Sequence, residues 1–164
     1  MKIYIIAWAR PNFMKIAPII NEIKKYSQIE YKIIHTWQHF DRNMSDKFFE
    51  DLHLPYPNIN LNIHWWGVCS QIWNIIISFD EILKNEKPDF VLVVWDVNST
   101  IACAMTAKQN WIKVIHVEAW LRSFDRSMPE EINRITTDSL SDLLFVSEKS
   151  WVENLKNEWK IDWV

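Results

Sequence analysis

The chain contains a single glycine, Gly67, among 164 residues. A globular protein of this length usually has roughly 7% glycine, or about eleven or twelve residues. The scarcity excludes the glycine-rich phosphate loops of nucleotide-binding proteins, because neither G-x-x-x-x-G-K nor G-x-G-x-x-G can be written with one glycine. It also leaves the tight turns of the chain without the residue that most easily adopts a positive φ.

Other absences narrow the function further. The 18 Lys and Arg residues do not exceed the 21 Asp and Glu residues, and the net charge of −3 offers no attraction to nucleic acid or anionic membranes. No stretch approaches the roughly 20 apolar residues of a membrane span, and the N-terminus lacks the pattern of a signal peptide. We therefore expect a cytoplasmic protein with no nucleic-acid or membrane partner.

Cysteine is scarce and carries no recognisable motif. Cys69 and Cys103 are far apart and form no C-x-x-C pair, so we expect two free, reduced thiols. No grouping of His, Cys and Asp has the spacing of a metal site, and no Ser-His-Asp signature is present. We expect neither a metal nor another cofactor.

Tryptophan is abundant where glycine is missing. The chain has 11 Trp and 1 Gly, and Trp8, Trp95 and Trp120 each follow a strand-like run at a point where the chain must turn tightly. A tryptophan-rich core would instead place Trp at helical or alternating spacing. We hypothesise that UGA codons, read as glycine in the source organism, are written here as tryptophan; UGG codons at these positions would contradict the idea.

Apolar, β-branched runs alternate with helical patterns along the whole chain. The expected strands are Lys2–Ala7, Tyr31–His35, Asn60–His64, Phe90–Val94, Lys113–Val117 and Leu143–Val146. The expected helices are Phe13–Tyr26, Met44–Leu52, Cys69–Asn85, Ser99–Gln109, Glu130–Ser141 and a last one from about Lys149 to Glu158. Pro18 predicts that the first helix begins late or bends. The alternation predicts one α/β domain over residues 1–164, with a Rossmann-like, doubly wound, mainly parallel sheet.

Ligands bind to such sheets outside the carboxyl ends of the strands. Four segments rich in polar residues or tryptophan lie at predicted strand ends: Trp8–Arg10, His35–His39, Trp95–Asp96 and His116–Trp120. We expect a site where they converge.

The first helix has the features of an anion site. Asn12 is a candidate N-cap, and Arg10 and Lys15 place two cations at the helix start. Backbone N–H groups, the helix dipole and these charges favour a diphosphate. The alternative is a solvated helix start with a structural arginine.

Two acidic residues close buried strands. Asp96 either caps a helix that starts near Asn98 or is a ligand and catalytic group. Glu118 either forms a structural salt bridge with Arg122 or belongs to the same site.

A proline marks the start of a later helix. Pro129 suits a first helical turn, and Glu130 and Arg134 lie four residues apart on one face. As a surface pair these two would contribute under about 1 kcal/mol.

Several segments match a known family once glycine is written for tryptophan. They are Gly-Ala-Arg-Pro-Asn-Phe-Met-Lys from position 8, His-Thr-Gly-Gln-His from His35, Gly-Asp-Val-Asn-Ser-Thr from position 95 and His-Val-Glu-Ala-Gly-Leu-Arg-Ser from His116. A further segment, Arg126-Ser-Met-Pro-Glu-Glu-Ile-Asn-Arg134, needs no replacement. In this order they resemble the non-hydrolysing UDP-N-acetylglucosamine 2-epimerases along the whole chain.

The resemblance implies the N-terminal half of a glycosyltransferase type B-like fold, with the substrate between two domains and the C-terminal nucleotide-binding domain absent from this chain. It implies interconversion of UDP-N-acetylglucosamine and UDP-N-acetylmannosamine by elimination and re-addition of UDP, by a homodimer. The implied catalytic residues are Asp96, Glu118 and Glu130; the implied substrate-binding residues are Arg10, Lys15 and Arg134; Gln38 and His39 match a stretch that in some members touches a second, activating UDP-N-acetylglucosamine.

Three alternatives share these features. A hydrolysing epimerase and a type-B glycosyltransferase have the same fold, and a truncated, non-catalytic remnant would keep it without activity. If Trp8, Trp37, Trp95 and Trp120 are true tryptophans, the indoles would fill space that a nucleotide sugar needs, and we expect no activity.

Overall fold

The computed structural model describes residues 1–37, 49–64 and 67–158. Six parallel strands form one sheet in the order β3-β2-β1-β4-β5-β6. The strands are β1 (Lys2–Ala7), β2 (Glu30–Trp37), β3 (Ile59–Ile63), β4 (Phe90–Val94), β5 (Lys113–Val117) and β6 (Leu143–Phe145). The helices are α1 (Arg10–Ile23), α3 (Val68–Asn85), α4 (Asn98–Gln109), α5 (Pro129–Leu140) and α6 (Lys149–Asn157). The predicted doubly wound, parallel α/β fold is confirmed.

The predicted elements all occur where the structure describes them, with small shifts at their ends. The strand expected at Tyr31–His35 runs two residues further, to Trp37, and a register shift interrupts its pairing with β3 there. The helix expected at Met44–Leu52 falls largely on residues 38–48, outside the described residues, and 49–51 are helical.

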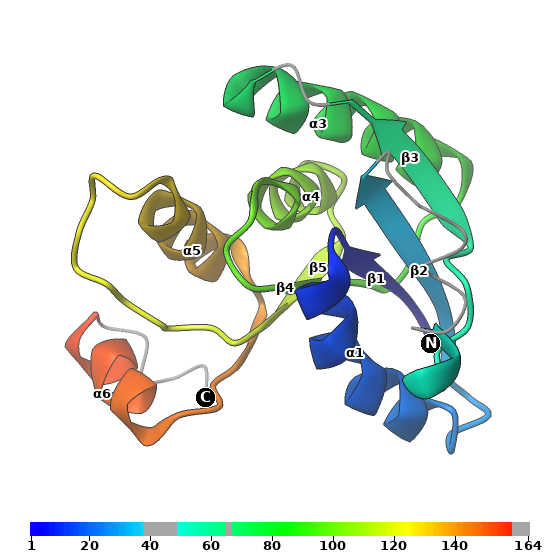
Figure 1. The fold of residues 1–164 in the computed structure, drawn as a ribbon, viewed down its shortest axis with the longest axis horizontal. Helices are drawn as coiled ribbons and strands as arrows, with labels where there is room; N and C mark the ends of the chain where they lie inside the picture. Colours follow the sequence, from blue (N-terminus) through cyan, green and yellow to red (C-terminus); the bar gives the residue numbers. More distant parts are fainter. Residues whose placement is uncertain (38–48, 65–66, 159–164) are drawn as a thin grey trace.

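The core has two layers because side chains of the buried strands alternate between the two faces of the sheet. Ile3 and Ile5 face α1, whereas Tyr4 and Ile6 pack with α3 and α4 on the opposite face. Figure 1 shows this division, with α1 on one side of the sheet and α3 and α4 on the other. A smaller cluster joins Trp120 to α6 and β6.

The first helix corrects two expectations. It begins at Arg10 rather than late, and Asn12 lies three positions inside it, where its side-chain oxygen accepts a hydrogen bond from the N–H of Ala9 at 3.1 Å. Asn12 is therefore not the N-cap, since Ala9 occupies that position. Pro18 lies inside the helix on its exposed face, where the hydrogen bond that proline removes costs least, because water can satisfy the freed carbonyl.

The two cysteines form no disulfide, as expected. Both cysteines are free, and burial raises the pKa of the Cys103 thiol. Within the described part of the chain, no helix combines the length and apolar character needed to cross a membrane.

Three of the tryptophans that the structure describes occupy the left-handed backbone region that favours glycine. Trp95 and Trp120 have φ of 67°, and Trp111 has φ of 63°. Trp8 is not among the positive-φ residues, so the expectation of a left-handed turn there is wrong; the N-cap that follows it, Ala9, is extended. The conformations at 95 and 120 are those that the glycine hypothesis requires.

Trp111 ends α4 in the geometry that glycine usually provides. The N–H of Trp111 bonds the carbonyl of Lys108, and the N–H of Ile112 bonds the carbonyl of Ala107, each at 3.0 Å. This is a Schellman motif with Trp111 at its left-handed position, and its side chain is 94% exposed.

The exposure of Trp111 makes it a clean test of backbone strain. We expect Trp111→Gly to raise the free energy of unfolding by about 1 kcal/mol, because a Cβ is unfavourable in the left-handed region, whereas Trp111→Ala changes it little. The control is Trp73→Gly on exposed, right-handed α3, which should lower stability by about 1 kcal/mol. Urea unfolding measures both, and a loss at position 111 equal to that at 73 would contradict the argument.

An ionic cluster lies at the amino ends of β1 and β2. Glu86 pairs with both Lys2 and Lys32, and its backbone carbonyl accepts the hydroxyl of Tyr4 at 3.3 Å. Hydrogen bonds from Lys2 and Lys32 lower the pKa of Glu86 from its ordinary value of 4.5 to about 2. The cluster joins the end of α3 to the amino ends of β1 and β2. The expected ligand site lies at the opposite, carboxyl ends of the strands.

The lowered pKa of Glu86 predicts a pH-dependent stability. The contribution is fully present above pH 4.5 and is lost as the pH falls through 4.5 toward 2. We expect Glu86→Gln to be less stable than the parent near pH 7 and the difference to shrink between pH 5 and pH 2 in chemical unfolding. Glu81→Gln, exposed on α3, is the control, and a pH-independent gap for Glu86→Gln would contradict the prediction.

Candidate functional site

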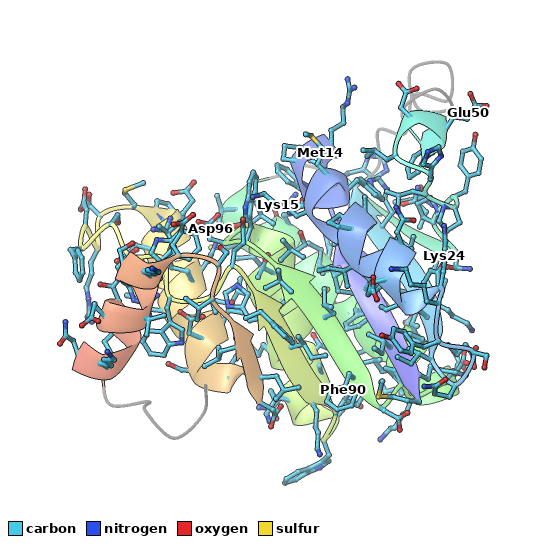
Figure 2. All side chains as sticks on the ribbon, turned by 90° about the horizontal axis from the view of Figure 1, so that it is seen from below. Met14, Lys15, Lys24, Glu50, Phe90 and Asp96 are labelled. Carbon is cyan, nitrogen blue, oxygen red and sulfur yellow. The ribbon has the colours of Figure 1, made fainter. Side chains whose placement is uncertain are left out.

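The strand order places the topological switch point between β1 and β4. Strands to one side of this point are β2 and β3, and those to the other are β5 and β6. Ligands of doubly wound sheets bind at the carboxyl ends of the strands beside such a point. Figure 2 shows Lys15 and Asp96 together at this end, with Phe90, the first residue of β4, at the opposite end.

Asp96 follows β4 and forms an ion pair with α5. Its Oδ2 accepts hydrogen bonds from Nη2 of Arg134 at 2.7 Å and from Nε at 3.1 Å. The N-cap of α4 is Val97, and no side chain caps that helix. The alternative of Asp96 as a helix cap is therefore wrong.

Arg134 bridges Asp96 to a buried carboxylate. Its Nη1 donates to Oε2 of Glu131 at 2.8 Å, so the alternative of a surface pair between Glu130 and Arg134 is wrong. Burial alone would raise the pKa of Glu131, but hydrogen bonds from the N–H groups of Ser123 and Phe124 and the charge of Arg134 lower it below its ordinary value. The sequence reasoning missed Glu131, although its i,i+3 spacing to Arg134 was a usable signal.

Glu118 follows β5 and forms an ion pair with α1. Its partner is Lys15, whereas Arg122 pairs with Asp138 and Glu158. The expected alternative, a salt bridge from Glu118 to Arg122, is therefore wrong. Glu118 itself has φ of 64°, a strained conformation that non-glycine residues adopt mainly where the surroundings hold them, often at functional sites.

Backbone hydrogen bonds tie the turns that carry Asp96 and Glu118. The N–H of Trp95 donates to the carbonyl of Val117 at 3.3 Å, joining the residues that immediately precede the two acids. Asn133 of α5 donates through its side-chain amide to the backbone carbonyl of Asp96 at 2.8 Å. Two carboxylates, each paired with one cation, therefore lie on neighbouring turns at the carboxyl ends of β4 and β5.

Two more predicted site residues, Glu130 and Arg10, lie at helix starts. Glu130 is exposed in the first turn of α5, and Arg10 is exposed as the first residue of α1. Gln38 and His39 lie outside the described residues. The structure thus joins four of the predicted residues in two ion pairs, Asp96 with Arg134 and Lys15 with Glu118.

The sequence also did not predict a buried hydrogen-bond network around Asp138, beneath the turns that carry Asp96 and Glu118. Asp138 bonds both Arg122 and His116, although 16 and 22 residues separate it from these two partners. No local spacing signals such a contact. Across residues 1–37, 49–64 and 67–158, no group of three or more His, Cys, Asp or Glu residues could hold a metal ion.

The strand order, the switch point and the polar groups gathered there define a Rossmann-like domain of the kind that binds nucleotides and their derivatives. Residues 21–162 match the model of a family described as UDP-N-acetylglucosamine 2-epimerase. The chain belongs to this family.

Individual relatives agree with the family. The chain is 50% identical over 158 residues to a UDP-N-acetylglucosamine 2-epimerase homolog of Methanococcus maripaludis, covering 96% of this chain and 44% of the relative. It is 43% identical to the UDP-2,3-diacetamido-2,3-dideoxy-D-glucuronate 2-epimerase of Pseudomonas aeruginosa, again over 96% of this chain and 45% of the relative. The chain therefore spans less than half the length of these relatives.

Solved structures place the fold in the same group. The Methanocaldococcus jannaschii UDP-GlcNAc 2-epimerase, solved with UDP-GlcNAc and UDP, superposes with a TM-score of 0.90 at 46% identity, over 96% of this chain and 43% of that one. A lipopolysaccharide outer core galactosyltransferase gives a TM-score of 0.66 at 17% identity, which supports the fold alone. The expected N-terminal half of a glycosyltransferase type B-like fold is confirmed.

Proposed function

We propose that this chain is the N-terminal domain of a sugar-nucleotide 2-epimerase that interconverts UDP-N-acetylglucosamine and UDP-N-acetylmannosamine. A second, nucleotide-binding domain would complete the protein, which accounts for the 44% coverage of the Methanococcus relative. The observation that carries the proposal is the placement of Asp96 and Glu118 on tied turns at the switch point, each with a cationic partner.

The reaction explains the residue types. The hydrogen at C2 is not next to a carbonyl, so its removal depends on departure of the charged UDP from C1 and on groups that stabilise this charge. A base removes the C2 proton and an acid returns one on the other face of the unsaturated sugar, before UDP adds again. Paired carboxylates in different surroundings can perform these two roles.

Specific residues would carry these steps. Asp96, Glu118 and Glu130 are the proposed proton-transfer groups. Arg10 and Lys15, with the N-terminus of α1, are placed to bind the diphosphate, and Arg134 holds Asp96 in position through two hydrogen bonds. The ion pair of Lys15 with Glu118 supports this assignment, because it joins the cation proposed for the diphosphate to a proposed proton-transfer group.

The wider assembly is part of the same proposal. We infer a cytoplasmic homodimer, in which a second copy would cover exposed apolar side chains of α3 such as Trp73 and Ile77. Light scattering of the complete protein tests this, and a monomer at micromolar concentration would contradict it. Gln38 and His39 are proposed to contact an activating second UDP-N-acetylglucosamine.

A product assay tests the activity. The complete protein, with glycine at positions 8, 37, 95 and 120, should convert UDP-N-acetylglucosamine into a mixture that contains UDP-N-acetylmannosamine. In D2O, the sugar should acquire deuterium at C2. Release of free N-acetylmannosamine would instead show a hydrolysing epimerase, and sugar transfer to an acceptor would show a glycosyltransferase. Residues 1–164 alone should be inactive, because the substrate would lack its second domain.

A parallel assay separates two substrates found among the relatives. The Pseudomonas relative is named for a diacetamido glucuronate nucleotide. Turnover of that sugar nucleotide, together with no turnover of UDP-N-acetylglucosamine, would replace the proposed substrate while leaving the 2-epimerase chemistry in place.

A further inference from the structure

We propose that Asp138 is a positioning residue. Through a buried network with His116 and Arg122, it fixes the positions of Glu118 and Asp96 relative to each other. The proposal deepens the function proposed above and rests on it. Asp138 belongs to α5 and is 1% exposed, so its carboxylate reaches the reacting groups only through other residues.

The carboxylate of Asp138 accepts hydrogen bonds from residues on both sides of Glu118. Its Oδ1 accepts from Nδ1 of His116 at 2.7 Å. Its Oδ2 accepts from Nη1 of Arg122 at 2.7 Å and from the N–H of Trp120 at 3.2 Å. One side chain of α5 thus binds residues two before, two after and four after Glu118.

The backbone between His116 and Arg122 adopts conformations that need the hydrogen bonds to Asp138. Glu118 and Trp120 both have left-handed φ values, 64° and 67°. Conformations of this kind persist where neighbouring contacts fix them. The N–H of Trp120 is one of those contacts, and Asn154 of α6 holds the carbonyl of the same residue at 3.0 Å.

His116 extends the network to the turn before Asp96. Its Nε2 bonds the carbonyl of Trp95 at 2.8 Å, while its Nδ1 bonds Asp138. A carboxylate at position 138 can accept from both His116 and Arg122, whereas an amide would turn an N–H₂ group toward at least one of these donors.

Charge compensation supports the carboxylate. Arg122 is 8% exposed and pairs with Asp138 and with Glu158 just beyond α6, the second pair at 2.7 Å. Its guanidinium also lies over the Trp120 ring, 4.6 Å from the centroid. Asp138 therefore connects α5 and β5 with the two turns that carry Asp96 and Glu118.

Asp142 is a matched control. Its carboxylate likewise accepts one backbone N–H of the β5 region, from Val114 at 2.7 Å, and one cation, Lys108, at 2.9 Å. Val114 lies near the amino end of β5, away from the turns.

Kinetics and hydrogen exchange of the complete protein, with glycine at positions 8, 37, 95 and 120, test the proposal. We expect Asp138→Asn to lower kcat by about 10²-fold, with KM changed far less, because a small misplacement of reacting groups costs about that factor. Amide exchange at residues 95 and 120 should accelerate. Asp142→Asn should keep kcat within about two-fold and leave these amides protected.

The outcomes separate this proposal from the epimerase proposal. Unchanged kcat in folded Asp138→Asn, or a loss equal in Asp142→Asn, would overturn the positioning role. If the parent protein shows no epimerase turnover, the function proposal fails, and unchanged exchange at residues 95 and 120 would overturn the positioning role independently. Should Asp138→Asn not fold, His116→Asn, whose shorter amide does not reach the carbonyl of Trp95, carries the same expectations.

Discussion

Replacing Trp8, Trp37, Trp95 and Trp120 with glycine in the complete protein is expected to convert an inactive protein into an active epimerase. At 95 and 120 glycine adopts the observed φ of 67° without a Cβ. At positions 8 and 95, which directly follow β1 and β4 beside the switch point, the smaller residue lets a ligand approach the backbone closely. We expect a gain in turnover of at least about 10²-fold, since displaced reacting groups cost about that factor.

Activity is the appropriate readout for these four substitutions, because two effects on stability oppose each other. Trp120 is 2% exposed and packs with Leu144 and Trp151, so glycine relieves backbone strain but leaves a cavity. Trp111→Gly, just beyond the end of α4 and 94% exposed, is the control and should not raise turnover. Full turnover by the tryptophan form would contradict the prediction.

The codon hypothesis has its own measurement. Intact mass of the protein purified from the source organism should be lower than the tryptophan sequence requires, by the difference between an indolylmethyl group and a hydrogen at each recoded position. A mass that matches 11 tryptophans, or UGG codons in the gene, would refute recoding.

Asp96→Asn is expected to reduce turnover by about 10³-fold in the active protein, since general acid–base groups contribute roughly 10²–10⁴-fold. The amide keeps the shape of the side chain and can still accept from Arg134, which now donates two hydrogen bonds to Oδ2. The fold should therefore survive, with thermal unfolding close to that of the parent.

Asp89→Asn is the matched control for Asp96. Asp89 accepts a hydrogen bond from the backbone N–H of Lys2 at 2.7 Å, at the amino end of β1 and far from the proposed site. Loss of the Asp89 charge should leave kcat unchanged. Near-normal turnover of Asp96→Asn would remove Asp96 from the proposed chemistry.

The fold could be predicted from sequence because its signals are local. Runs such as Phe90–Val94 are strand-length and apolar, and the strand observed there has the predicted bounds. Pro129 marks the start of α5 correctly. The error at α1 came from Asn12, whose side chain reaches back to Ala9 from inside the helix, a use of asparagine that sequence does not distinguish from capping.

The site could be predicted only in part. The position of Asp96 and Glu118 at strand ends follows from the alternation of strands and helices. Their partners do not, because the choice of Glu131 over Glu130 by Arg134 depends on the rotation of α5 against the sheet. The contact of Asp138 with His116 likewise depends on tertiary packing.

The most direct test of the account is a crystal structure of the complete protein with UDP-N-acetylglucosamine bound. The account predicts the diphosphate at the N-terminus of α1 near Arg10 and Lys15, and C2 of the sugar within reach of the Asp96 and Glu118 carboxylates, with Glu130 facing the same sugar. A nucleotide sugar bound away from the carboxyl ends of β1 and β4, with these acids directed elsewhere, would contradict it.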